Sequence, residues 1–339
     1  MTTGAPGHQS GSVVRASAPG RAGIIGNPTD GYGGSVISCS LAQRATVTLA
    51  PAEGFEAVVE GKTTTFRTPE DRALKGDYFD FIRATVQFLG YEDLKVRVEA
   101  RTDIPVQAGL AGSTALLASL VAAIRCYLGE RHLQRHLLAE TVRTIELNFL
   151  RIQCGYQDQY MTTFGGLNYM DFRDKEYYRP LEEEVYATVE PLADLVPALP
   201  FVVVHTGVKR TSGHILKPIR ERWMDGDVRV VRGYRRIGAL CRRAKRALIE
   251  GDWEALAAAM IENHRIQQEL GASGEENDRL IEIAQREGAM AAKLAGAGGG
   301  GTIIALSLEP ERTIAALRAA GAATVLNLKP SPGVTVEAS

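Results

Sequence analysis

A glycine-rich turn that runs directly into an apolar segment most limits what this chain can fold into. Residues 109–115 read Gly-Leu-Ala-Gly-Ser-Thr-Ala and precede the apolar segment 116–124. That segment is rich in Ala and Leu, both strong helix formers, and Gly129 is suited to end the helix. Free N–H groups and the positive dipole end at the start of such a helix bind phosphate. The alternative is a tight turn with a Ser or Thr cap.

The residues inside this turn narrow the kind of phosphate site. Ser113 and Thr114 place hydroxyls where a phosphate-bound Mg²⁺ would lie. The turn is not a Walker A loop because no Gly-Lys-Ser/Thr follows it. The glycine spacing also differs from that of a Rossmann dinucleotide-binding loop.

Two further glycine clusters support a phosphate site. One runs from Ala18 to Gly34, and the other, residues 293–301, ends in four consecutive glycines before the apolar segment 302–306. Four glycines in a row cost backbone entropy, so they are expected where the backbone approaches a ligand closely. A flexible linker is the alternative, but linkers are polar on both sides, whereas this run precedes a strand-like segment.

The three clusters, in this order and spacing, resemble the three motifs of the GHMP kinases, a family that includes galactokinase, homoserine kinase and mevalonate kinase. The resemblance extends from about Val13 to about Leu328. Within the family the sequence is most similar to the glucuronokinases. The residues that carry this similarity are 26–30, 109–113, 165–172 and 220–227. Residues 205–212 also resemble the heptose-phosphate kinases.

The order of the expected elements predicts an α+β protein, because strand-rich material comes first and helices with scattered strands follow. The resemblance implies the two-domain GHMP kinase fold, with a ribosomal-S5-like N-terminal domain and a ferredoxin-like C-terminal domain. Three prolines interrupt the pattern around residues 190–200. We therefore expect a disordered tail over 1–12, an ATP-binding domain over 13–195, a second domain over 196–330 and a tail over 331–339.

Phosphoryl transfer from ATP requires charge neutralisation, positioning and a base for the attacking hydroxyl. The resemblance assigns Mg²⁺ to Thr114 and Glu146, with Glu140 as the alternative ligand, and the catalytic base to Asp158. Arg21 would stabilise the transferring phosphoryl group, unless it is a surface arginine. The residues assigned to ATP are Pro105, Gly109, Leu110, Ala111, Gly112, Ser113, Thr114, Gly298 and Gly299.

The substrate side is less sharply defined. Many relatives carry Glu-His at Asn27-Pro28, and this departure fits the glucuronokinase pattern. A uronic acid also needs a cation for its carboxylate, and the sequence does not choose among Lys209, Arg210, His214, Arg220 and Arg222. The residues predicted to bind the substrate are Asn27, Thr29, Asp30, Gly165, Gly166 and Arg220.

The leading hypothesis is an ATP- and Mg²⁺-dependent sugar kinase that phosphorylates the anomeric hydroxyl of a sugar acid, glucuronate. One alternative changes the substrate to a heptose phosphate or a neutral sugar, and another is a non-catalytic nucleotide- or sugar-binding regulator. A net charge of −1 gives no electrostatic argument for nucleic acid or an anionic membrane. The cysteines are scattered along the chain and the N-terminus lacks a signal-peptide pattern, and both observations favour a cytoplasmic protein. The sequence leaves open whether the protein forms a homodimer.

Overall fold

One long bent strand organises the N-terminal domain. The first half of β2 (Ser35–Pro51) pairs with β6 (Leu167–Asp171), and its second half pairs with β5 (Val96–Thr102). Along its other edge β2 pairs with β1 (Val14–Ile25), whose register shifts near Gly20 and Ile24. The sheet order is β12-β1-β2-β5-β3-β4, with β6 attached to β2 and β7 (Thr188–Pro191) to β6. This computed structural model describes residues 12–130, 132–176, 179–208, 213–296, 298 and 301–339.

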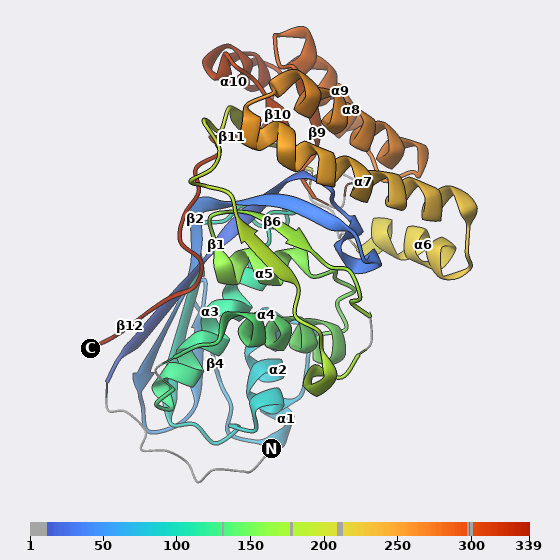
Figure 1. Ribbon diagram of the computed structural model, residues 1–339. Helices are drawn as coiled ribbons and strands as arrows, with labels where there is room; N and C mark the ends of the chain where they lie inside the picture. The colour runs from blue at the N-terminus through green and yellow to red at the C-terminus, as the bar shows by residue number, and fades with distance from the viewer. Residues whose placement is uncertain (1–11, 131, 177–178, 209–212, 297, 299–300) are drawn as a thin grey trace.

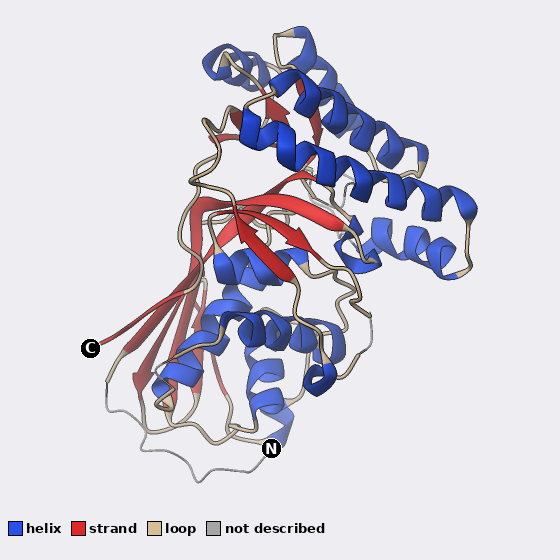
Figure 2. Ribbon diagram, viewed as in Figure 1, coloured by secondary structure: helices blue, strands red, loops and turns tan. Residues whose placement is uncertain are grey.

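Helices cover one face of this sheet (Figures 1 and 2). The central one, α3 (Gly112–Tyr127), is buried on nearly all sides, as expected from its continuous apolar sequence. The other elements of this domain are η1 (Thr29–Tyr32), β3 (Glu56–Val59), β4 (Lys62–Thr65), α1 (Pro69–Arg72), α2 (Asp80–Leu89), α4 (Arg135–Thr144), the π-helical turn η2 (Ile145–Phe149), α5 (Gln157–Phe164) and η3 (Leu181–Glu183).

The C-terminal domain is a four-stranded antiparallel sheet with helices on it. Its order is β11-β8-β10-β9, so the strands numbered along the chain lie as 4-1-3-2. This is the ferredoxin-like arrangement, and it confirms the expected fold class. The strands are β8 (Phe201–His205), β9 (Ala291–Leu294), β10 (Thr302–Leu306) and β11 (Thr324–Asn327), and the helices are α6 (Gly213–Met224), α7 (Val228–Glu250), α8 (Trp253–Glu269), α9 (Glu275–Arg286) and α10 (Pro310–Ala319).

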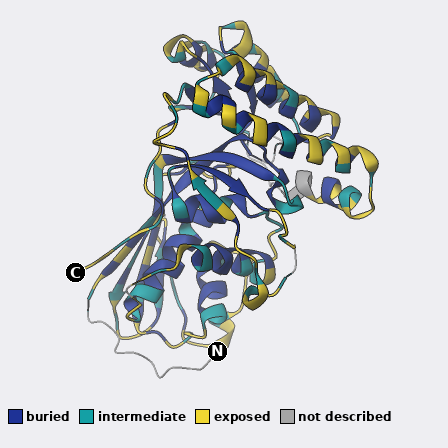
Figure 3. Ribbon diagram, viewed as in Figure 1, coloured by how far each residue is buried: buried dark blue, intermediate teal, exposed yellow. Residues whose placement is uncertain are grey.

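The two domains share a continuous hydrophobic core. Buried residues of α7 and α8, among them Leu240 and Met260, belong to the same cluster as Ile24 and Ile37 of the N-terminal sheet. Figure 3 shows exposed residues along the outer faces of these helices and buried residues on the sheet. Among the described residues, no helix combines the length and the apolar character that a membrane span needs.

The C-terminal segment differs from the expected tail. Residues 331–339 return to the N-terminal domain, where β12 (Thr335–Ala338) pairs with the start of β1 (Figure 1). The Arg44 guanidinium donates to the carbonyls of Pro332 and Gly333, at 2.6 and 2.7 Å. The prediction was wrong because the stabilising hydrogen bonds join residues about 320 positions apart, and no local pattern reports such pairing. The N-terminal domain therefore includes both ends of the described chain.

Candidate active site

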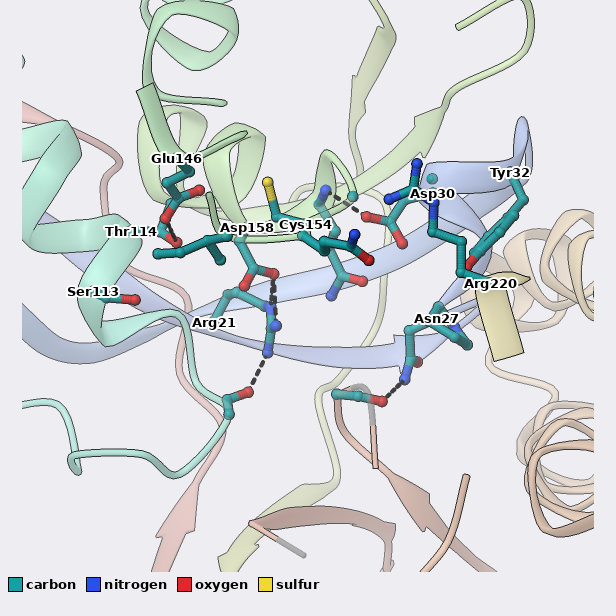
Figure 4. A pocket seen from close by; sticks show the side chains of 18 residues that line it. Arg21, Asn27, Asp30, Tyr32, Ser113, Thr114, Glu146, Cys154, Asp158 and Arg220 are labelled. Atoms are coloured by element: carbon teal, nitrogen blue, oxygen red, sulfur yellow. Dashed lines mark hydrogen bonds and ion pairs between the residues drawn. The ribbon is translucent and has the colours of Figure 1, made fainter. Parts of the chain in front are cut away.

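A cavity of about 180 Å³ lies where the two domains meet (Figure 4). Its lining comes from β1, the loop into η1, the turn before α3 and the segment between η2 and α5. The C-terminal domain contributes Arg220 from α6 and Gly296 after β9. One end of the cavity contains Thr114 and Glu146, the other contains Asp30 and Arg220, and the centre lies between them.

An arginine–aspartate pair occupies the centre. Arg21 Nε and Nη2 donate to the same Asp158 oxygen, Oδ1, at 2.8 and 2.6 Å, while Nη1 donates to the Gly109 carbonyl at 2.6 Å. Arg21 comes from the buried strand β1, and Asp158 is in the first turn of α5. The arrangement holds a carboxylate and a guanidinium beside the glycine turn; the roles predicted for them, base and phosphoryl stabiliser, remain predictions.

The end near α3 brings together Thr114 and Glu146, the two residues that could hold a magnesium ion. Thr114 Oγ1 donates to Glu146 Oε1 at 2.7 Å, and the Gln159 amide donates to Oε2. Burial raises the pKa of Glu146 to about 7, although both hydrogen bonds oppose the shift. A buried carboxylate with so high a pKa fits a divalent cation, which would keep it ionised. Glu140, the alternative ligand, instead pairs with Lys175 at 2.6 Å.

The phosphate turn has the backbone of an anion cradle. Gly109 and Ala111 adopt positive φ angles of 73° and 62°, and Gly112 begins α3. The exposed Ser113 hydroxyl lines the cavity, whereas Leu110 is buried and its carbonyl accepts from Arg21 N at 3.0 Å. Pro105 is half-buried and is not among the lining residues.

The third glycine cluster meets this turn, as predicted. A Cβ added at Gly296 would lie 3.1 Å from the Gly109 carbonyl oxygen, and one at Gly301 would lie 2.8 Å from the Ala108 carbonyl oxygen. Gly298 packs instead against Ala272 and does not line the cavity. Gly299 lies outside the described residues.

At the opposite end, Asp30 caps the helix that carries Asp158. Asp30 Oδ2 accepts from the backbone N–H groups of Tyr156 and Gln157, at 2.7 and 2.9 Å. Burial raises the pKa of Asp30, and these two hydrogen bonds oppose the shift. A Cβ added at Gly155 would lie 1.9 Å from Asp30 Oδ2, so only glycine permits this approach.

The neighbouring polar residues of this loop face inward. Thr29 Oγ1 donates to the Gly26 carbonyl at 2.7 Å, and Thr29 does not line the cavity. Asn27 lines the cavity, but its amide donates to the Gly296 carbonyl at 2.8 Å and accepts from Lys293 Nζ at 2.7 Å. Both side chains therefore stabilise the loop, a role that the sequence analysis, which assigned them to the sugar, did not predict.

Sequence comparisons agree with this geometry. Residues 79–166 match the GHMP kinases N terminal domain, residues 244–324 match the GHMP kinases C terminal domain, and residues 7–51 match the galactokinase galactose-binding signature. The three matches include the phosphate turn, Asp158 and the loop with Asp30. The chain belongs to the GHMP kinase family.

Relatives of this GHMP kinase act on sugars. Glucuronokinase 1 from Arabidopsis thaliana is 27% identical over 314 residues, which are 86% of this chain and 84% of the relative. The fold matches that of Lactococcus lactis galactokinase complexed with galactose, with a TM-score of 0.77 at 19% identity over 95% of each chain. It also matches a D-glycero-D-manno-heptose 1-phosphate kinase from Bacteroides thetaiotaomicron, with a TM-score of 0.73 at 20% identity over 96% and 98% of the two chains. The protein is an ATP-dependent sugar kinase.

Two residues predicted to bind the sugar lie elsewhere in this GHMP kinase. Gly165 forms a bridge with Pro332, and the backbone N–H of Gly166 donates to Ser40 Oγ at 2.9 Å. Neither glycine lines the cavity. Both glycines instead contact the C-terminal segment, Gly165 by a close approach and Gly166 through its N–H, which also donates to the Ser331 carbonyl at 2.8 Å. A Cβ added at Gly165 would lie 2.0 Å from Gly333 N.

Several lining residues were missed by the sequence reasoning. Tyr32 lies near Arg220, Cys154 lies between Asp30 and the centre, and Gln157, whose backbone N–H donates to Asp30, also lines the cavity. Burial raises the pKa of the Cys154 thiol well above its usual value. Gln157 directly precedes Asp158 in the interruption between two helices. This position was the sequence signal that could have identified it as a lining residue.

Proposed function

We propose that this sugar kinase phosphorylates the anomeric hydroxyl of a sugar acid, glucuronate, using MgATP. The observation that carries the proposal is the placement of a buried arginine, Arg220, at the end of the cavity opposite Thr114 and Glu146. A uronic acid bound there would direct its carboxylate toward a cation and its reacting hydroxyl toward Asp158. The similarity to Glucuronokinase 1 supports the same substrate.

In the proposed reaction, Asp158 accepts the proton of the sugar hydroxyl and Arg21 stabilises the transferred phosphoryl group. Both guanidinium hydrogen bonds go to Asp158 Oδ1, so we assign proton acceptance to Oδ2. The sugar oxygen forms a bond to the γ-phosphorus, the bond to the β–γ bridging oxygen breaks, and the hydroxyl proton passes to Oδ2. Arg21 stabilises the charge on the transferred phosphoryl group, whose loose transition state needs mainly positioning and electrostatic support.

Thr114 and Glu146 would hold the magnesium ion. Mg²⁺ bound to phosphates typically takes one or two protein ligands and keeps several waters. The described residues include no group of three or more His, Cys, Asp or Glu side chains arranged for a metal. When bound, the ion neutralises phosphate charge. The Glu146 carboxylate must then lose the proton that burial favours.

A heptose phosphate or a neutral sugar is the second candidate substrate. The fold similarity to the heptose 1-phosphate kinase and to galactokinase favours it. A phosphorylated substrate would also use a cation at Arg220. A neutral sugar carries no negative charge for such a cation to pair with.

A substrate panel distinguishes these candidates. Specificity constants for glucuronate, galacturonate, glucose, galactose and heptose 7-phosphate are measured by ADP release, and phosphorus NMR locates the new phosphate. Arg220→Gln should lower the specificity constant for glucuronate at least about tenfold more than that for glucose. Lys217→Gln, an exposed cation on the same helix and outside the cavity, is the matched control. Equal use of glucose and glucuronate by the wild type would disprove the proposal.

A further inference from the structure

A buried lysine of the C-terminal domain, which has no role in the proposed chemistry, contacts the loop that leads into η1 (residues 26–28). We call this loop the sugar loop. Lys293 is in β9 and is fully buried, and its Nζ donates to Asn27 Oδ1 at 2.7 Å and to the Leu294 carbonyl. A buried ammonium group is unfavourable unless it is paired and hydrogen-bonded. Its retention at this contact therefore needs an explanation beyond packing.

Lys293 determines which way the Asn27 amide points. An asparagine amide offers donors on one side and an acceptor on the other. Burial lowers the pKa of Lys293 to about 7, and in its ammonium form the side chain can only donate. It then requires Oδ1 on its own side, and Nδ2 faces the carbonyls of Gly296 and Leu294, at 2.8 and 3.3 Å. The reverse orientation would set donor against donor at Lys293 and acceptor against acceptor at Gly296.

Backbone groups of this loop and of the end of β1 also contact the C-terminal domain. Gly26 N donates to Asn263 Oδ1 at 3.0 Å, Asn263 Nδ2 donates to the Asn27 carbonyl at 3.5 Å, and Gly23 N of β1 donates to the Ala295 carbonyl at 2.9 Å. These backbone contacts leave the side-chain orientation of Asn27 undetermined. The hydrogen bonds of the Asn27 amide to Lys293 Nζ and to the Gly296 carbonyl together specify it, and Lys293 is the side chain that fixes the Oδ1 side.

Gly296 connects this loop to the phosphate turn. It accepts from Asn27 and lies in close contact with the Gly109 carbonyl, which in turn accepts from Arg21 Nη1 at 2.6 Å. A displacement of Asn27 would therefore reach Gly296, the phosphate turn and the Arg21–Asp158 pair through direct contacts (Figure 4). Each step is a packed or hydrogen-bonded contact, so the loop and the turn have little freedom to move separately.

We propose that Lys293 is a positioning residue that couples the sugar and nucleotide sites. By fixing the Asn27 amide against Gly296, it makes the ordered sugar loop and the ordered phosphate turn favour one another. Binding of either substrate then promotes binding of the other, and the coupling is reciprocal. The inference rests on sugar kinase activity and not on glucuronate as the substrate.

The test measures this coupling directly. Calorimetry gives the affinity for a non-hydrolysable ATP analogue with Mg²⁺, with and without a saturating amount of whichever sugar the wild type phosphorylates. We expect the sugar to raise nucleotide affinity about fivefold or more in the wild type. In Lys293→Met the enhancement should fall to nearly one, with a smaller change in nucleotide affinity without sugar. Asn27→Ala should give the same loss, and the double variant should lose no more than either single one.

Leu317→Ala is the control for general destabilisation, because Leu317 is buried in the separate core beneath α10. It should lower the melting temperature and leave the coupling unchanged. Unaltered coupling in folded Lys293→Met, or no coupling in the wild type, would overturn the inference. If Lys293→Met does not fold, unaltered coupling in Asn27→Ala decides against it equally. A wild type that phosphorylates only neutral sugars disproves the uronate proposal but leaves this test valid with those sugars.

Discussion

The two ends of the cavity are built in different ways. At the phosphate end, Thr114, Glu146 and the glycine turn all belong to the N-terminal domain and contact one another within it. At the sugar end, Asp30 is fixed by the start of α5, and Arg220 arrives from the C-terminal domain. The side chains of the phosphate end thus come from one domain, and the C-terminal domain adds only glycine backbone beside the turn, whereas the sugar end takes charged side chains from both domains.

This difference separates chemistry from selectivity. The groups that bind phosphate are positioned by a helix N-terminus and by short polar contacts. The same arrangement can serve kinases that act on different acceptors. The sugar end depends on how a helix of the second domain is placed over a loop of the first. Changes at the phosphate end should alter turnover and nucleotide use, and changes at the sugar end should alter acceptor binding.

The largest expected effect is at the centre, where the two ends meet. Asp158→Asn should lower kcat at least about a hundredfold, the usual contribution of a positioned base, while the KM values for sugar and ATP change little. Steady-state kinetics of both substrates measures this. Asp171→Asn is the control, since Asp171 pairs with Arg173 outside the cavity. A kcat near the wild-type value would remove Asp158 from the mechanism and weaken the division between the two ends.

A methyl group at Gly155 tests the sugar end specifically. Gly155→Ala should displace the Asp30 carboxylate from its two N–H donors, because the new Cβ would lie 1.9 Å from Oδ2. Disrupting a buried hydrogen-bonded carboxylate costs about 1–3 kcal/mol, so the sugar KM should rise between about fivefold and a hundredfold. The KM for ATP should change less. Gly54→Ala, where an added methyl meets no atom within 4 Å, is the control, and equal kinetics in the two variants would contradict the assignment.

The pH dependence of nucleotide binding tests the phosphate end. The folded-state pKa of Glu146 is raised to about 7, so the cation-free protein loses stability as pH rises from about 4.5 to about 7. Binding of MgATP releases this proton, and its affinity should increase with pH up to about 7, by at most about tenfold per unit. Glu146→Gln should lose this dependence between pH 5.5 and 8.5, and it should need more Mg²⁺. Protonation of ATP itself changes the affinity of the wild type and of Glu146→Gln equally. Parallel pH profiles of MgATP affinity in the two proteins would therefore exclude Glu146 as the metal ligand.

The smallest expected effect concerns one hydroxyl in the phosphate turn. Ser113→Ala removes a single exposed donor from the cavity wall, and a hydrogen bond of this kind contributes about 0.5–1.5 kcal/mol. The KM for ATP should rise about two- to tenfold, with the sugar KM unchanged. Ser119→Ala on the same helix is the control, because Ser119 donates to the Ala115 carbonyl away from the cavity. A larger change in the sugar KM than in the ATP KM would contradict the division.

The amino-acid sequence by itself determined the fold class and the phosphate end. A glycine turn followed by an apolar helix specifies its own local conformation, and the interruption around Asp158 marks a helix start without distant information. Three glycine clusters in a fixed order also predicted that residues 296–301 lie beside the phosphate turn. Gly296 and Gly301 do, whereas Gly298 packs against Ala272.

The tertiary structure alone decided the contacts between residues far apart in the chain. Residues 331–339 return to β1, and Gly165 contacts that segment and does not line the cavity. Of the candidate cations, Arg220 is the one that lines the cavity among the described residues. The tertiary structure also turned the Asn27 amide toward Lys293, 266 positions away. Local propensity and periodicity depend on neighbours within a few residues. A contact across hundreds of residues depends on how whole domains pack, which no local pattern records.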